Sequence, residues 1–85
     1  MRRGFYRHFK GRYYEVLGVA RHSESLEEMV VYKALYKHKN FGHHSLWVRP
    51  AGMFLEFVRT AGGGKVRRFA PVTGPEKTRA VKPAR

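Results

Sequence analysis

The sequence has no cysteine and no aspartate, and only six acidic residues, all glutamates, accompany its 18 lysines and arginines. Without cysteine the chain cannot form a disulfide framework or a thiolate metal site. No apolar run approaches the roughly eighteen residues of a transmembrane helix, and Phe5–Phe9 is too short and too polar for a signal-peptide core. We therefore expect a protein that is not secreted and has no membrane partner. Its expected location is the cytoplasm or an organellar matrix such as that of the mitochondrion.

What the sequence does contain is a strand-like alternation of apolar or aromatic residues with charged ones, in Tyr13–Leu35 and again in Leu46–Val58. Six Phe, five Tyr and one Trp supply the apolar volume for one small core. From residue 71 onward the chain has three prolines, four basic residues and little apolar content, which is typical of a segment that does not fold alone. We predict a β domain over residues 1–70 and a basic, Pro-containing tail over residues 71–85.

Short strands joined by sharp turns predict a mainly β fold, a small SH3-like five-stranded barrel with one or two short helical turns. The predicted strands are Phe5–Phe9, a second that follows the turn at Gly11, Met29–Tyr32, Leu46–Arg49 and Lys65–Val72. A glycine inside a strand often marks a bulge, so Gly18 predicts a bend in the second strand.

Two segments allow both a helix and a strand. Ser25–Glu28 has the spacing of a helix capping box, and an apolar stripe continues over Leu26–Tyr36. The β-branched and aromatic residues of Met29–Tyr32 favour the strand there. Gly52–Val58 fits either one helical turn or a strand, and Lys37–Ser45 is polar and predicts a loop.

Several segments together resemble a known family. They are YRHFKG at 6–11, YEV at 14–16, GVARHSE at 18–24, VVYKALY at 30–36, WVRP at 47–50 and MF at 53–54. In this order they resemble the small bacterial proteins grouped as domain of unknown function 1653. The resemblance implies a compact SH3-like β fold, favours a strand at residues 29–36 and implies no activity. The chain departs from the family at Lys37–Ser45, where members usually have a shorter loop.

The stretch Arg21-His22-Ser23-Glu24 contains residue types found in acid–base and nucleophilic sites. Neighbours on a strand face opposite sides and rarely form a triad. We therefore predict no enzyme. We also predict no metal site and no cofactor, because neither cysteine nor aspartate accompanies the five histidines. Since the stretch matches the family, the candidate contacts to a ligand are His22, Ser23, Glu24 and Arg49. In the structural alternative, Ser23 bonds the backbone and Arg21 pairs with a glutamate.

The strongest functional signal is the net charge of +12, which exceeds the magnitude of about 2–8 that solubility alone suggests. Such a surface attracts phosphates, and counterion release supplies the affinity. The predicted nucleic-acid contacts are Arg2, Arg3, Arg7, Lys10, Arg12, Arg21, Lys65, Arg67, Arg68, Lys77, Arg79, Lys82 and Arg85. We predict a non-catalytic RNA-binding protein, a structural component of a ribosome or other ribonucleoprotein particle. Its partners would be RNA, ribosomal RNA above all, and neighbouring ribonucleoprotein proteins. The alternatives are a protein- or small-ligand-binding module and a DNA-binding protein.

The aromatic residues divide into predicted core and predicted contact residues. Trp47 lies between Leu46 and Val48 in a strand, so it is predicted to anchor the core. Tyr36 and Phe41 flank the polar loop and are the better candidates for stacking on a base.

Overall fold

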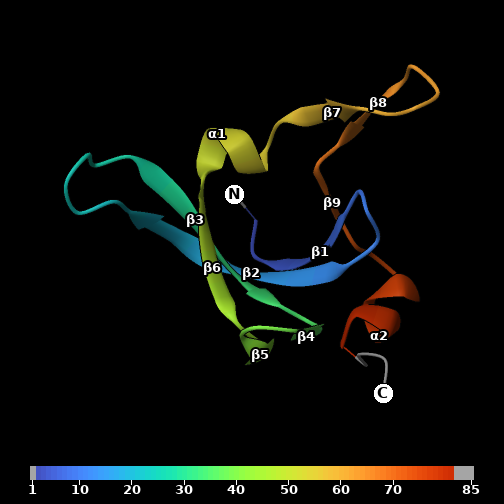
Figure 1. Ribbon diagram of the computed structural model, residues 1–85, viewed down its shortest axis with the longest axis horizontal. Coiled ribbons are helices and arrows are strands. Elements are labelled where there is room, and N and C mark those ends of the chain that lie inside the picture. Colours follow the sequence, from blue (N-terminus) through green and yellow to red (C-terminus); the bar gives the residue numbers. More distant parts are fainter. Residues whose placement is uncertain (1, 82–85) are drawn as a thin grey trace.

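The computed structural model describes residues 2–81, and its largest element is a five-stranded antiparallel sheet (Figure 1). The sheet has the order β6-β3-β2-β1-β9, formed by β1 (Gly4–His8), β2 (Tyr13–Arg21), β3 (Glu28–Ala34), β6 (Leu46–Pro50) and β9 (Phe69–Pro71). The remaining elements are β4 (Lys37–His38), β5 (Gly42–His43), β7 (Phe57–Arg59), β8 (Lys65–Arg67), α1 (Ala51–Phe54) and α2 (Glu76–Val81). β4 pairs with β5, and β7 pairs with β8.

The mainly β prediction is confirmed, but the closed five-stranded barrel is not. Within residues 2–81, β6 and β9 remain at opposite edges of an open sheet. The predicted last strand over residues 65–72 breaks at Arg68, which binds the carboxylate of Glu56 with an Nη2–Oε1 distance of 2.7 Å. Because of this break, β8 pairs with β7 as a separate hairpin, and β9 alone returns to pair with β1.

The strand at residues 28–34 is confirmed over the helical alternative. Its buried residues alternate with more exposed ones, as Val30, Tyr32 and Ala34 show, and this is the period of a strand with one face against a core. The bulge is also confirmed, because the pairing of β2 with β3 shifts register between Val16 and Gly18.

The predicted helical turn near residue 25 does not form, whereas the one near residue 52 does. Ser25 lies in a turn, and its Oγ accepts a hydrogen bond of 3.2 Å from the backbone N–H of Glu27. The local bond of a serine side chain competes with helix formation. After β6, α1 forms the single helical turn that the sequence allowed, and β7 follows it.

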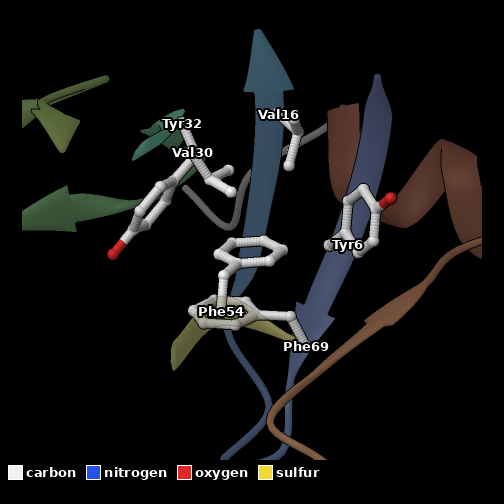
Figure 2. Packing of buried hydrophobic residues seen from close by; sticks show 6 residues of the cluster. All are labelled: Tyr6, Val16, Val30, Tyr32, Phe54 and Phe69. Carbon is white, nitrogen blue, oxygen red and sulfur yellow. The ribbon is translucent and has the colours of Figure 1, made fainter. Parts of the chain in front are cut away.

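The core is a small aromatic cluster, made of Tyr6, Val16, Val30, Tyr32, Phe54 and Phe69 (Figure 2). The rings of Phe54 and Phe69 stack face to face with centroids 4.1 Å apart. Tyr6 and Tyr32 pack edge-on against Phe54 at 5.5 and 5.4 Å. Edge-on packing is favourable for the quadrupoles of aromatic rings. Phe54, carried by α1, is therefore the residue that covers the core side of the sheet.

The part of the predicted tail that the structure describes, residues 71–81, contains the end of β9 and the helix α2. Pro71 ends β9 and pairs with Tyr6. Val72 is 3% exposed and Ala80 1%. The carboxylate of Glu76 accepts a 2.9 Å hydrogen bond from the hydroxyl of Tyr13, which fastens α2 to the sheet on the side away from α1 (Figure 1). β1 offers this segment a template for pairing, which its composition does not reveal.

Candidate functional site

The strand register gathers aromatic side chains on the core side of the sheet. Tyr32 of β3 lies directly opposite Trp47 of β6, and such pairs point to the same face. The ring centroids of Tyr14, on β2, and Tyr32 are 5.4 Å apart. Arg49 follows Trp47 by two residues in β6, so its side chain joins the same face.

The β4–β5 hairpin, formed within the predicted loop, encloses one side of this group. The ring of His38 lies 4.9 Å from that of Phe41 and 5.5 Å from that of Trp47. Just before the hairpin, the hydroxyl of Tyr36 shares a 2.9 Å hydrogen bond with the hydroxyl of Tyr14. These contacts hold the hairpin against the sheet.

Together these side chains form an open pocket of about 180 Å³, here called the aromatic pocket, lined by Tyr14, Tyr32, Tyr36, His38, Trp47 and Arg49. A second hollow of about 310 Å³ shares Tyr36 and His38 with it. This hollow adds Arg12, Lys37 and Lys39, here called the basic rim. The guanidinium carbon of Arg12 lies 4.4 Å from the ring centroid of Tyr36. Flat apolar walls and positive charge are thus adjacent.

The pocket is positively charged and offers hydrogen-bonding groups. No carboxylate lines the pocket or its rim, and within residues 2–81 no acidic group forms an ion pair with Arg49. Burial raises the pKa of Tyr14 far above its ordinary value, and the hydrogen bond with Tyr36 raises it further. The Tyr14 hydroxyl therefore keeps its proton at neutral pH. Such an arrangement suits a planar ligand that carries negative charge.

Trp47 is not the fully buried core anchor that the sequence predicts. It packs against the core cluster but stays partly exposed and lines the pocket. Its Nε1–H donates a 2.8 Å hydrogen bond to Ser45 Oγ. Of the two residues predicted to stack on a base, Tyr36 lines the pocket, and Phe41 is 63% exposed beside Trp47.

The structure spreads the predicted nucleic-acid contacts over several surfaces. Of those that it describes, Arg12 is the one on the basic rim, and the predicted ligand contact Arg49 lies in the pocket. The others lie in a hollow near the start of β1 (Arg2, Arg3 and Lys77), around Phe9 (Arg7, Lys10, Arg67 and Arg68), at the end of β2 (Arg21) and on β8 (Lys65). Lys82, Arg85 and the side chain of Arg79 lie outside the described residues.

Some of these cations already have acidic partners. Two nitrogens of Arg68, Nη2 and Nε, contact the same carboxylate oxygen of Glu56, Oε1, at 2.7 and 2.9 Å, and such charge-assisted bonds fix both side chains. Arg7 and Arg21 lie 3.9 Å from glutamates and are more than half exposed, so these pairs are weak. Arg68 is thus committed to an internal contact, whereas the other two remain accessible to phosphate.

The predicted ligand contacts at residues 22–24 lie in the β2–β3 turn, outside the aromatic pocket. His22 Nδ1 accepts hydrogen bonds from the backbone N–H groups of Glu24 and Ser25, at 3.1 and 3.2 Å. Arg21 Nη1 donates to the carbonyl of Leu26 at 2.8 Å. The structural alternative that the sequence allowed is met in part. Arg21 lies 3.9 Å from Glu28, but the side chain that bonds the backbone in this turn is that of Ser25, with the N–H of Glu27, and not that of Ser23.

Sequence reasoning did not assign Tyr14, Lys37, His38 or Lys39 to a site. Tyr14 is on the same face as Val16, which its spacing in the strand indicates. Its position next to Tyr32 depends on the register of β2 with β3, and this register cannot be derived from the local sequence pattern. His38 lines the pocket, and Lys37 and Lys39 lie on its rim. The β4–β5 hairpin places them there, in a segment for which the sequence predicts only a loop.

His8 lies next to Tyr14 of the aromatic pocket. Because it is partly buried, we expect the stability of the folded protein to depend on pH. Burial lowers the pKa of His8 below its ordinary value of 6.5, and the positive charges of Arg68 and Arg49 lower it further. The unfolded chain therefore binds a proton at this residue at higher pH than the folded protein does. We expect the free energy of unfolding to fall as the pH drops below 6.5, and to fall less steeply in His8→Gln. Urea unfolding at a series of pH values measures this, and equal slopes for the two proteins would contradict it.

Two further features concern the described residues alone. Within residues 2–81, no three or more histidine and glutamate side chains gather as they would around a metal ion. Across the same residues, no helix is long and apolar enough to cross a membrane.

Comparison with known proteins places the chain in a family. The family model described as "Protein of unknown function (DUF1653)" matches residues 4–71. A crystal structure of a DUF1653 protein from Bordetella bronchiseptica is 38% identical, with a TM-score of 0.74, and the match covers 87% of this chain and 94% of that one. No curated protein matches the chain. The resemblance seen in the sequence is thus confirmed, and the chain belongs to the DUF1653 family of proteins of unknown function.

Proposed function

We propose that the protein binds single-stranded RNA without catalysing a reaction. One unstacked base enters the aromatic pocket, and the neighbouring phosphates lie against Arg49 and the basic rim. The observation that carries the proposal is the combination in one place of four aromatic walls, an arginine without an ion-pair partner among the described residues, and a cationic rim without a carboxylate.

The chemistry of the pocket favours a nucleotide over other ligands of aromatic pockets. Aromatic cages that bind methylated ammonium groups attract a cation to the ring faces, but Arg49 repels a cation here, and no carboxylate of the pocket lining compensates. Proteins read RNA through unpaired bases that stack on aromatic side chains. A base in a DNA duplex must first leave its stack, at a cost of a few kcal/mol. A single-stranded nucleic acid is therefore the ligand that the pocket suits best.

The single tryptophan of the chain, Trp47, reports on this pocket directly. Titration with a single-stranded oligouridylate should quench its fluorescence, because the base stacks beside it. Arg49→Gln should weaken binding about tenfold or more, since a charge-assisted hydrogen bond contributes about 1.5–3 kcal/mol. Arg3→Gln removes the same charge from an exposed residue outside the pocket and rim and should change the affinity much less.

The salt dependence is a second measurement. Contact with about four phosphates gives a slope of about −3 for log K against log salt on a single strand, and Arg49→Gln should reduce its magnitude by about 0.7. A slope near zero, or equal losses in Arg49→Gln and Arg3→Gln, would contradict the proposal. Tighter binding of single-stranded DNA would assign the pocket to DNA instead. Membership of a ribonucleoprotein particle is tested separately, by co-sedimentation of the native protein with ribosomes at low and high salt.

A further inference from the structure

We propose that Phe9 and Arg67 form a second nucleotide site, which binds another base of the same RNA strand beside the aromatic pocket. This inference rests on the proposed function and extends it. It gives the protein a footprint of more than one nucleotide and assigns a function to the base of the β7–β8 hairpin.

The second site is a hollow between β1 and β8. It has a volume of about 260 Å³, and its lining includes Phe9, Val66, Arg67 and Ala70. Phe9 is 38% exposed. An exposed ring beside apolar side chains is a platform on which a base of any kind can stack.

Cations surround this platform. The guanidinium carbon of Arg67 lies 5.2 Å from the ring centroid of Phe57, its partner in the β7–β8 register. The ammonium of Lys10 lies 5.9 Å from the ring centroid of Phe9. Across residues 2–81 neither cation forms an ion pair, and no carboxylate lines the hollow. Arg68 is also near Phe9, but Glu56 holds it. Arg7 also lines the hollow, and its 3.9 Å pair with Glu76 is weak. Arg67, Lys10 and Arg7 are therefore the groups available to a phosphate.

His8 connects the second site to the first. It lines the hollow, and its ring centroid lies 4.7 Å from that of Phe9. The ring centroid of Tyr14, which lines the aromatic pocket, is 6.3 Å from that of His8. β8 belongs to a hairpin that extends away from the sheet (Figure 1). A strand bound in the aromatic pocket can thus continue past His8 to Phe9 and Arg67.

The length of the ligand tests this inference. Trp47 fluorescence is titrated with uridine monophosphate and with oligouridylates from the dinucleotide to the octanucleotide. The wild-type affinity should rise with length, and Phe9→Ala should weaken octanucleotide binding about 5- to 140-fold, as expected for the loss of one stacked base. Binding of uridine monophosphate should stay unchanged, because this ligand occupies the aromatic pocket alone.

Arg67→Gln is the second variant, since Arg67 is exposed and its replacement leaves the apolar platform in place. It should also weaken octanucleotide binding without affecting the monophosphate. Val19→Ala, at a residue that is 45% exposed and outside the aromatic pocket, its basic rim and the hollow at Phe9, is the control. Wild-type octanucleotide affinity in Arg67→Gln and in any folded Phe9→Ala, with normal monophosphate binding, would overturn the second site alone. If no ligand quenches Trp47 in the wild type, the proposed function fails as well.

Discussion

Phe54→Ala should leave the protein largely unfolded at physiological temperature. The Phe54 side chain is 1% exposed and stacks on Phe69 at 4.1 Å. It also receives the ring edges of Tyr6 and Tyr32. Replacing a buried phenylalanine by alanine costs about 3–5 kcal/mol, whereas a domain of this size has a total stability on the order of 5 kcal/mol. The loss of stability is large because Phe54 is the buried residue of α1. Without its ring, no buried side chain attaches this helical turn to the core.

Circular dichroism and urea unfolding measure this effect. The matched control is Phe57→Ala, three residues later, where the ring is 56% exposed and contacts Arg67. Surface substitutions usually change stability by about 0.5 kcal/mol or less, so the control should melt near the wild-type temperature. A folded Phe54→Ala with the same melting temperature as Phe57→Ala would show that the core does not depend on this stack.

Truncation after Pro71 should lower the melting temperature strongly, although the composition of the removed segment predicts no effect. The truncated protein loses the burial of Val72 and Ala80 and the hydrogen bond from Tyr13 to Glu76. Burial of a valine contributes about 1.5–3 kcal/mol, and a hydrogen bond to a charged group about 1.5–3 kcal/mol. Together these terms come to about 3–6 kcal/mol. A loss of this size corresponds to a decrease of 10 °C or more, since about 1 kcal/mol shifts a small domain by about 4–8 °C.

Thermal unfolding of the truncated and full-length chains at equal ionic strength measures this difference. The structure predicts a large decrease in melting temperature, and the composition of the removed segment predicts none. Lys77→Ala is the control for α2, because Lys77 is exposed and lies next to Glu76. It should change the melting temperature by only a few degrees. An unchanged melting temperature in the truncated protein would mean that β9 completes the fold without the residues that follow it.

Local patterns were sufficient to predict several elements, because a two-residue alternation and a glycine inside a strand have direct structural causes. The strand at residues 28–34 and the bulge at Gly18 were predictable in this way. The segment that contains α1 was left open between a helical turn and a strand, and the structure decided for the turn at residues 51–54. The family and the strongly basic character could also be recognised, since both depend on residue identity alone. The number of strands in the main sheet was predictable, but its open form was not.

The tertiary structure decided which residues meet. Tyr14, Tyr32 and Trp47 converge because the register of three strands places them on one face, and register depends on pairing between distant segments. The same long-range pairing brings β9 to β1 and orders part of the predicted tail. Charge is visible in the sequence wherever it occurs, but a pocket exists only where separate strands and hairpins come together. For this reason the sequence by itself determined a basic β protein of a known family, and only the fold decided that Arg49 shares a pocket with Trp47.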